Sequence, residues 1–402
     1  MTVKVLIADK LEDSAVRQLK AGGFQVVVDA ALSGADLDEA VRREQPTILV
    51  VRSTRVPVSA MDASSHLELI VRAGAGYDTI DVSAASEHGI FVSNCPGKNA
   101  VAVAELTMAL ILALDRKIAD NVIDAREGRW NKAAYSKADG IKGKTLGIIG
   151  LGSIGRAVAD RARGFDLNVM AWSRSLDRVT ARDLELTFAD TPQVVAAHSD
   201  IVSLHVAATP ETKGLAGRAF FEEMKDGAFF INTTRSSVVD EEALLWALDN
   251  KRIHAGLDVF EGEPPAKQCA FDAALAKHPN VYLTHHIGAS TAQAQKSIAE
   301  EAVRVVRTYA EKGQVLNCVN MAEKTPATHQ ITVRHRDKVG VLAAILDECR
   351  SAGWNVQEME NLIFEGARAA CAHIRFDGDP DRAVIERITG HEDVLAVSLI
   401  EL

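Results

Sequence analysis

The feature that most constrains the fold is a glycine-rich turn between an apolar run and a helical pattern. The run "TLGII" leads directly into Gly150-Leu151-Gly152-Ser153-Ile154-Gly155, and the helical pattern begins at Arg156. This spacing is typical of dinucleotide-binding folds: Gly150 permits a tight turn, Gly152 lets backbone approach a pyrophosphate, and Gly155 lets the helix pack on the strand. Free N–H groups at the helix start would bind the phosphate. The alternative is a strand–helix turn that binds no ligand.

Short β-branched runs alternate with helical patterns on both sides of this turn. The runs are "VKVLIAD", "FQVVVDA", "PTILVVR", "LELIVRAG" and "IFVSN" before it, and "DIVSLHV", "GAFFINTT", "HAGLDVF" and "NVYLTHH" after it. Such alternation predicts an α/β fold with parallel sheets in two similar lobes. Residues 99 to about 120 combine helix formers with almost no polar face. We therefore expect a buried helix between the lobes, with Asn99 as a candidate N-cap.

The last quarter of the chain has a different pattern. Residues 319–329 are polar, contain a proline and show no sustained period, so we interpret them as a linker. Residues 330–402 then give a βαββαβ order, which fits a small ferredoxin-like module. We expect residues 1–98 and 287–318 to form one doubly wound, Rossmann-like lobe and residues 99–286 to form the dinucleotide-binding lobe.

Composition restricts the partners of this chain. Of its 402 residues, 47% are hydrophobic and 25% charged, which is ordinary for two or three globular domains. A net charge of -10 would repel nucleic acid and anionic lipid, so an anionic substrate needs a local basic pocket. The longest apolar stretch, 106–114, is too short to cross a bilayer, and the first residues begin a strand instead of a signal peptide. We therefore expect a cytoplasmic protein.

The cysteines are also consistent with a protein of the cytoplasm. The five cysteines are scattered and lack any CxxC spacing, which argues against a disulfide framework or a metal site. We interpret them as reduced thiols.

The second strand after the glycine turn bears on the choice of nucleotide. NAD-specific folds carry a carboxylate there that accepts hydrogen bonds from the ribose 2′-OH. This chain instead has Ser173-Arg174-Ser175, which offers hydroxyl donors and a planar cation to a 2′-phosphate. The sequence therefore predicts that NADP is accepted as well as NAD. In the alternative interpretation Arg174 lies in solvent, NAD binds without the carboxylate, and nearby Asp177 substitutes for it.

Three later motifs connect the chain to a known family. They are "INTTRSSVVDEEAL", "GLDVFEGEPP" and "THHIGAS". With them the chain resembles the D-isomer-specific 2-hydroxyacid dehydrogenases over essentially its whole length, and within that family the members that oxidise 3-phosphoglycerate and carry a C-terminal ACT regulatory domain. The resemblance implies that Arg235, Glu263 and His286 are catalytic, that Thr233 contacts the cofactor, and that Asp258 lies near the nicotinamide amide. For Asp258 a salt bridge at the end of a strand is the alternative.

Hydride transfer explains why these residue types are needed. A proton must leave or join the C2 oxygen of the hydroxy acid as the hydride moves, and histidine performs such transfers near neutral pH. A carboxylate beside the imidazole favours its protonated form and fixes the ring, the role implied for Glu263. Arg235 would bind the substrate carboxylate and polarise the C2 oxygen.

The resemblance also implies a site for the substrate on the first lobe. The loop "RAGAGYDTID" matches the family's substrate loop, in which glycine backbone can approach a carboxylate closely. The candidate substrate residues are Arg52, Arg72, Gly74, Ala75, Gly76, Asn99 and Lys132. Arg52 and Arg72 match arginines that contact the phosphate. Ordinary salt bridges at the rim of the site are the alternative for both.

In the C-terminal module, His335, Asp337 and Asn355 resemble an L-serine effector set. The alternative is that the module serves only packing and dimerisation, and either case suggests a homodimer or homotetramer.

The motifs also depart from the family pattern. Ser236-Ser237 replaces the usual glycine pair, and His285 replaces the proline before the catalytic histidine, so that His285 is a second candidate for the titrating group. Two other functions therefore stay open. One is an NADPH-dependent glyoxylate or hydroxypyruvate reductase, and the other is a dinucleotide-sensing regulatory protein similar to corepressors that reuse this fold.

Overall fold

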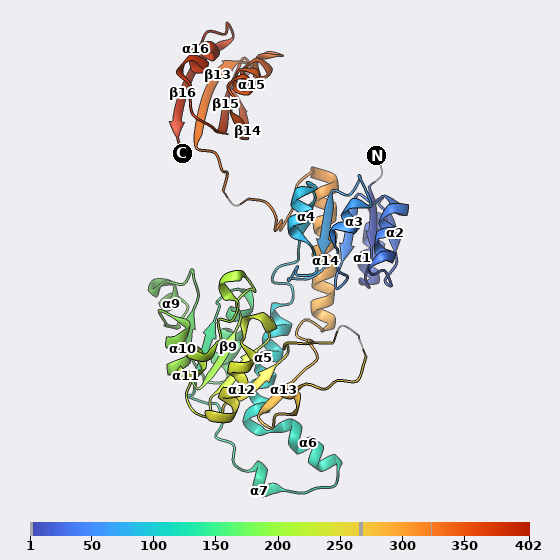
Figure 1. Ribbon diagram of the computed structural model, residues 1–402, viewed down its shortest axis with the longest axis vertical. Helices are drawn as coiled ribbons and strands as arrows, with labels where there is room; N and C mark the ends of the chain where they lie inside the picture. The colour runs from blue at the N-terminus through green and yellow to red at the C-terminus, as the bar shows by residue number, and fades with distance from the viewer. Residues whose placement is uncertain (1–2, 265–267, 323) are drawn as a thin grey trace. The chain divides into compact units, whose positions relative to one another are not determined.

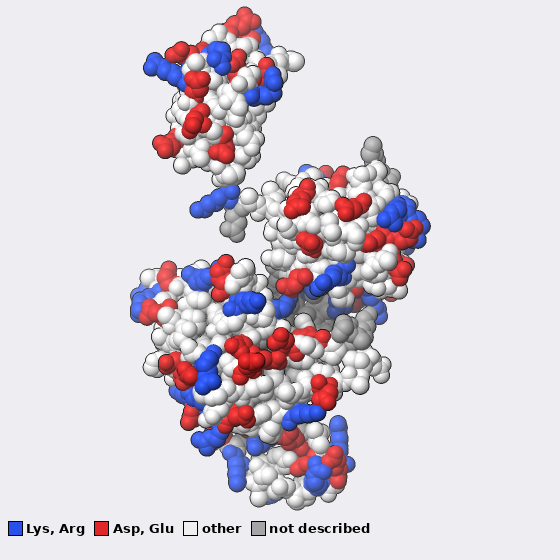
Figure 2. Space-filling model, in the orientation of Figure 1, with Lys and Arg blue, Asp and Glu red and all other residues white. Residues whose placement is uncertain are grey.

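The computed structural model describes residues 3–264, 268–322 and 324–402. By its internal contacts the chain divides into two compact units, Met1–Asn320 and Met321–Leu402. No helix in the described ranges combines the length and the apolar character needed to cross a membrane. On the face drawn in Figure 2, acidic and basic side chains are interspersed over both units.

The first lobe of the N-terminal unit is a parallel sheet with helices on both sides. Its strands are β1 (Lys4–Ile7), β2 (Gln25–Val28), β3 (Ile48–Val51), β4 (Leu69–Arg72) and β5 (Phe91–Ser93), in the order β2-β1-β3-β4-β5. Its helices are α1 (Asp13–Ala21), α2 (Ala35–Glu44), α3 (Val58–Asp62), α4 (Val82–Glu87) and α14 (Ala292–Lys312). Strand β3 is buried along its whole length, as its continuous apolar sequence requires. Helix α14 follows the second lobe in sequence but packs on α1 and β4, so both ends of the unit build this lobe (Figure 1).

The second lobe is a larger parallel sheet in which the strand order reverses beside β6. Its strands are β6 (Thr145–Ile149), β7 (Asn168–Trp172), β8 (Thr187–Phe188), β9 (Ile201–Leu204), β10 (Phe229–Asn232), β11 (His254–Leu257) and β12 (Val281–Leu283), in the order β12-β11-β10-β9-β6-β7-β8. The helices are α5 (Ala100–Arg116), α8 (Ser153–Gly164), α9 (Arg178–Asp183), α10 (Pro192–His198), α11 (Arg218–Glu223), α12 (Glu241–Asn250) and α13 (Ala274–Lys277). The glycine turn follows β6 and so lies at the point where the order reverses, the usual ligand position in such sheets.

The long helix α5 starts where it was predicted to start but ends earlier. It begins at Ala100 as expected, but the Asn99 side chain does not cap it. It ends at Arg116 because Lys117 adopts a left-handed conformation (φ +48°), and a separate helix α6 (Ile118–Arg126) continues the chain. Helix α6 and the short α7 (Lys132–Tyr135) project from the end of the second lobe that lies away from the first lobe (Figure 1).

Polar contacts hold the segments that run between the lobes. The carboxylate of Glu301, on α14, is 5% exposed and pairs with Lys98, Arg304 and the amide of Asn317. The hydrogen bond from Arg304 lowers the pKa of Glu301 to about 2, so this carboxylate stays ionised at any ordinary pH. Asn317 also donates to the backbone oxygen of Asn94. These contacts tie α14 to the segment that leads into α5.

The C-terminal unit has the expected βαββαβ order. Its elements are β13 (His329–Arg336), α15 (Val341–Ser351), β14 (Asn355–Ile363), β15 (Ala369–Asp377), α16 (Arg382–Thr389) and β16 (Val394–Glu401). The strands pair antiparallel in the order β14-β15-β13-β16. Both helices bury apolar side chains against one sheet face, where Trp354 stacks on Phe376 with ring centroids 4.2 Å apart.

Candidate active site

The glycine turn after β6 has the geometry that a dinucleotide phosphate requires. Gly150 has φ +98°, and a Cβ there would meet the backbone of His205 at 2.6 Å. A Cβ on Gly155 would lie 2.1 Å from the oxygen of Gly150, so the helix packs directly on the turn. Gly152, the N-cap of α8, faces open space and has no side chain to satisfy the first N–H groups of the helix. The residues present therefore fit a bound pyrophosphate.

The other predicted nucleotide residues lie around this turn. Ser153 is next to Gly97 of the segment joining the lobes, while Ile154 packs into the core of the second lobe. Thr233 is buried, and its hydroxyl lies 3.3 Å from that of Thr107 on α5.

After β7, Arg174 and Ser175 are exposed and Ser173 is half-buried. A hydrogen bond from Thr209 and, more weakly, the positive charge of Arg174 lower the pKa of Glu211, so Arg174 lies near that carboxylate. Asp177, the alternative partner for the ribose, instead caps α9 by accepting a hydrogen bond from the Thr180 N–H.

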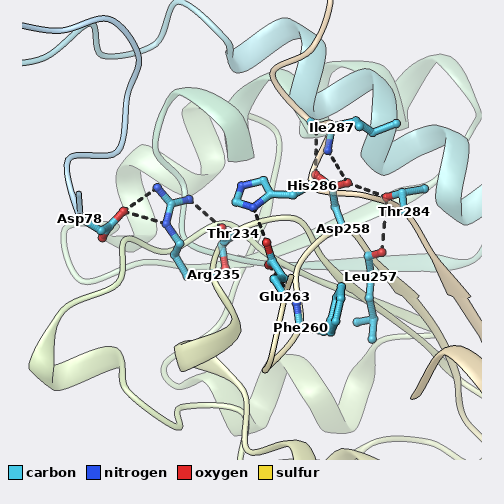
Figure 3. Close-up of polar contacts among 11 residues, drawn as sticks. Asp78, Thr234, Arg235, Leu257, Asp258, Phe260, Glu263, Thr284, His286 and Ile287 are labelled. Atoms are coloured by element: carbon cyan, nitrogen blue, oxygen red, sulfur yellow. Dashed lines mark hydrogen bonds and ion pairs between the residues drawn. The ribbon is translucent and has the colours of Figure 1, made fainter. Parts of the chain in front are cut away.

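A buried carboxylate shapes the loop that carries His286. Asp258, at the end of β11, is 1% exposed and accepts hydrogen bonds from the N–H groups of Ile287 and Gly288, each at 2.8 Å (Figure 3). The Thr284 hydroxyl donates to the same carboxylate at 2.6 Å, and the His286 N–H donates to the Asp258 backbone oxygen. Within the described ranges Asp258 pairs with no lysine or arginine, so the alternative of a strand-end salt bridge is wrong. Its contacts position the loop.

His286 and Glu263 form a hydrogen-bonded pair at this loop. The Nδ1 atom of His286 lies 2.8 Å from Oε2 of Glu263 (Figure 3). This bond raises the pKa of His286 against the opposing effect of partial burial, because a carboxylate stabilises the imidazolium. His286 has φ +53°, a conformation uncommon outside glycine that is often found at functional sites. Both His285 and His286 line a cavity of about 370 Å³, but of these two histidines only His286 forms a hydrogen bond with Glu263 in the described structure.

Arg235 lies on the other side of the imidazole and contacts the first lobe. Its Nη1 donates to the Thr234 backbone oxygen at 2.8 Å, and Asn232, at the end of β10, donates to the backbone oxygen of Arg235. Its Nε and Nη2 both donate to Oδ2 of Asp78, which belongs to the loop after β4 (Figure 3). Asp78 was not among the predicted site residues, because only the fold brings it to Arg235.

Two guanidinium groups lie against glycines of the loop after β4. A Cβ on Gly74 would lie 1.5 Å from Nη1 of Arg72, and one on Gly76 would lie 1.8 Å from Nη2 of Arg235. The groups that approach these glycines in the structure are therefore guanidinium cations; the close approach of a substrate carboxylate stays a prediction. The backbone oxygen of Ala75 accepts a hydrogen bond from the Asn94 side chain at 2.6 Å.

The remaining predicted substrate residues are only partly brought together. Arg52 lines a cavity of about 380 Å³ with Ala73 and residues 10–13, which lead into α1. Within the described residues, Oδ1 of Asn99 is buried without a hydrogen-bond partner. Lys132 begins α7 and is exposed on the projecting segment, so within one copy of the chain it does not join Arg52 and Arg72. Helix α6 leads the chain away from the first lobe, so a substrate role for Lys132 stays a prediction.

The departures from the family pattern fit the backbone. Ser236 and Ser237 lie in a 3₁₀ turn, Ser236–Val238, and neither has a positive φ. The side chains that replace the usual glycines therefore require no strained conformation here.

Comparisons with known proteins agree with this geometry. Residues 108–288 match the family model described as D-isomer specific 2-hydroxyacid dehydrogenase, NAD binding domain. The chain is 34% identical over 348 residues to D-3-phosphoglycerate dehydrogenase of Archaeoglobus fulgidus, covering 85% of this chain and 64% of the relative. It thus spans less than two thirds of that relative's length.

Two further similarities involve reductases. Over 261 residues the chain is 42% identical to hydroxypyruvate reductase of Thermotoga maritima, covering 64% of this chain and 83% of the relative. A solved structure of the NADPH-dependent glyoxylate/hydroxypyruvate reductase of Sinorhizobium meliloti, in complex with NADP and malonate, aligns with TM-score 0.67 at 29% identity over 79% of this chain and 97% of that one.

The family match covers the glycine turn and the loops that carry Arg235, Asp258, Glu263 and His286. The cofactor of the second lobe is accordingly a nicotinamide dinucleotide, NAD or NADP. The chain belongs to the D-isomer-specific 2-hydroxyacid dehydrogenase family.

Proposed function

We propose that this chain oxidises D-3-phosphoglycerate to 3-phosphohydroxypyruvate, the first step of serine biosynthesis, with NAD or NADP as hydride acceptor. The observation that carries the proposal is the pair of guanidinium groups, Arg72 and Arg235, that lie on the glycines of one loop where the lobes meet. A substrate with a carboxylate at one end and a phosphate at the other suits two separate cations. The phosphoglycerate dehydrogenases among the relatives support the same substrate.

Unpaired polar atoms support an anionic ligand with hydroxyl groups. In the described structure the Nε of Arg72 and the Oδ1 of Asn99 are both buried without a hydrogen-bond partner. Burial lowers the pKa of Arg72, and the nearby charge of Arg235 lowers it further, yet a guanidinium stays protonated in proteins. Leaving a buried donor or acceptor unpaired costs about 1–3 kcal/mol. A bound phosphate or hydroxyl that pairs with these atoms would recover part of that cost.

His286 is the proposed acid–base group. Because its Nδ1 is bonded to Glu263, its Nε2 faces the substrate. During oxidation Nε2 takes the proton of the C2 hydroxyl as the C2–O bond becomes a carbonyl, and during reduction it returns that proton. The bound nicotinamide supplies the other half of the chemistry by accepting or donating the hydride. Glu263 stabilises the imidazolium that forms, and Arg235 binds the substrate carboxylate.

A hydroxypyruvate or glyoxylate reductase is the second candidate. The 42% identity to the Thermotoga maritima enzyme and the exposed Arg174 beside the nucleotide turn favour it. The same residues would serve that reaction, since only the group that contacts Arg72 differs between the substrates.

The C-terminal unit is proposed to be an ACT regulatory domain that pairs with a second copy. Exposed apolar side chains on its two edge strands, β14 and β16, support pairing; they are Leu362, Ile363, Leu395, Leu399 and Ile400. His335 is buried and bonded to Asn361, Asp337 is exposed, and Asn355 lies at the opposite end of β15 from His335. An L-serine site built from this set therefore requires two copies of the unit. The cytoplasmic location also stays a prediction.

Removing Arg72, the proposed partner of the phosphate, should affect KM for the two candidate substrates differently. Arg72→Ala is expected to raise KM for 3-phosphohydroxypyruvate at least about tenfold and to change KM for hydroxypyruvate by less than about twofold, because only the first carries the phosphate. Initial rates of reduction measure both. Arg55→Ala, an exposed arginine just after β3, is the matched control. Equal losses for both substrates would contradict the phosphate role, and no turnover with any 2-oxo acid would favour a regulatory protein.

The Glu263–His286 bond predicts a change in pH dependence. In Glu263→Gln the pKa of His286 should fall, because the carboxylate that raises it is gone. Reduction needs protonated His286, so the limb on which kcat/KM falls with rising pH should move to lower pH. Profiles of kcat/KM against pH test this, with His285→Gln as the control that leaves the limb in place. If the limb moved only in the His285 variant, His285 and not His286 would be the titrating group.

The nucleotide residues predict how NADP and NAD compare. We expect NADP to support turnover, and Arg174→Ala to lower kcat/KM with NADP about tenfold while leaving NAD unchanged, since only NADP carries the 2′-phosphate. Arg178→Ala, a nearby arginine paired with Asp190, is the control. A strong preference of the unaltered chain for NAD, with no effect of Arg174→Ala on either nucleotide, would overturn this assignment.

Titration calorimetry tests the effector site. L-serine should bind the full-length chain, D-serine should bind more weakly, and Asn355→Ala should remove the binding. Absence of heat with L-serine at concentrations up to about 1 mM would reject the site.

A further inference from the structure

We propose that Asp78 is a positioning residue that orients the guanidinium of Arg235 for an anionic substrate, so that the first lobe sets the direction of a donor carried by the second. The inference rests on the substrate-binding role proposed for Arg235. It adds a residue of the first lobe to that role.

The contacts of Arg235 leave one edge of its guanidinium available. The group has five N–H donors. The Nε–H and one N–H of Nη2 point to Oδ2 of Asp78 at 2.9 and 2.8 Å, and one N–H of Nη1 points to the Thr234 oxygen. The remaining two donors lie on the terminal edge, one on each Nη. This is the edge that binds a carboxylate in the bidentate manner.

The loop that contains Asp78 also fixes the height of the guanidinium. Because a Cβ on Gly76 would lie 1.8 Å from Nη2, the group lies directly on the loop backbone two residues before Asp78. Asp78 thus holds the side edge while Gly76 provides the surface beneath it. Figure 3 shows Asp78 on the opposite side of Arg235 from His286.

Asp78 also lies near a second cation, Arg72, although among the described residues its ion pair is with Arg235. Arg72 lies close enough to Arg235 for each to oppose the charge of the other, and the charge of Asp78 partly offsets this repulsion. Both direct contacts of Asp78 are with Arg235, so its loss is expected to remove the direction of the terminal edge of Arg235.

The ion pair contributes little to stability. The Asp78 side chain is 56% exposed and that of Arg235 is 33% exposed. Pairs this exposed are worth about 0–1 kcal/mol. Orientation of a catalytic donor is more sensitive, because small misplacements of reacting groups lower rates by large factors. We therefore assign the pair to positioning.

A competing view makes Asp78 a stand-in for the substrate carboxylate that must be displaced. The geometry argues against it, because Asp78 uses one oxygen on the side edge and leaves the terminal edge unoccupied. The two views also predict opposite effects. A positioning residue improves substrate binding, whereas a competitor weakens it.

Kinetics of single variants form the first test. Asp78→Ala is expected to raise KM for the 2-oxo acid about tenfold, with Asp78→Asn between it and the unaltered chain, while the Kd for NADH is unchanged. Asp81→Ala is the matched control, since Asp81 is an exposed carboxylate of the same loop that caps α4. An unchanged or lower KM in Asp78→Ala overturns the proposal, as does an equal rise in Asp81→Ala.

A double-mutant cycle tests whether Asp78 acts through Arg235. In an Arg235→Lys background the fork that Asp78 orients is absent, so adding Asp78→Ala should change KM by less than about twofold. Independent effects that multiply would show that Asp78 acts by another route and would overturn the proposal.

The choice of substrate separates this inference from the proposed function. Asp78 acts at the carboxylate end, so KM should rise equally for 3-phosphohydroxypyruvate and hydroxypyruvate, unlike the effect of Arg72→Ala. If the chain reduces hydroxypyruvate or glyoxylate but not the phosphorylated acid, the proposed function fails and the cycle is run with the accepted acid. If it turns over neither, titration of the NADH-loaded chain with oxalate gives the Kd for the same cycle, and an oxalate Kd that Asp78→Ala leaves unchanged overturns the proposal.

Discussion

The geometry of the site depends on the buried carboxylate of Asp258. A buried charge is costly unless hydrogen bonds satisfy it, and here the N–H groups of Ile287 and Gly288 and the Thr284 hydroxyl do so. Because the partners are backbone groups of the loop after β12, satisfying the carboxylate also fixes the path of that loop. The backbone of His286 is thereby held in its left-handed conformation, which turns the imidazole toward Glu263. The proposed acid–base pair follows from one charge at the end of β11.

The positive charges at the candidate site come from a few nearby residues and not from the net charge of the protein. The chain carries a net charge of -10, yet the loop after β4 places two guanidinium groups on its glycines. Only glycine permits this, since a side chain at either position would occupy the place of a cation. Asp78 and the burial of Arg72 then adjust how those charges are presented. An acidic protein can therefore bind an anionic acid, because short-range hydrogen bonds outweigh a distant, screened repulsion.

Local sequence rules predicted the strands, the helices and the glycine turn well, because each of these depends mainly on residues close together in the sequence. The turn Gly150–Gly155 follows the expected local geometry: a Cβ at Gly150 or Gly155 would clash with nearby backbone, and Gly152 leaves the start of α8 uncovered. The N-cap role of Asp177 could also be predicted from the sequence, because an aspartate three residues before the Thr180 N–H is an ordinary N-cap. Contacts between distant segments were not predictable in this way. Asp78 meets Arg235 across 157 positions of sequence, and nothing in either motif encodes that distance.

The features of the structure that the sequence did not predict also have physical origins. Helix α5 stops at Lys117 without a glycine or proline to announce it, and the chain direction that follows carries Lys132 away from the first lobe. The resemblance placed Asp258 near the nicotinamide amide, which stays a prediction; the structure adds that its carboxylate accepts hydrogen bonds from the His286 loop, a contact between distant segments. The two lobes thus have different roles: the second fixes the imidazole by backbone contacts, and the first carries the loop on which the proposed anion site is built. Arg235 belongs to the second lobe but takes its orientation from the first, and for that reason it is the residue through which the lobes act together.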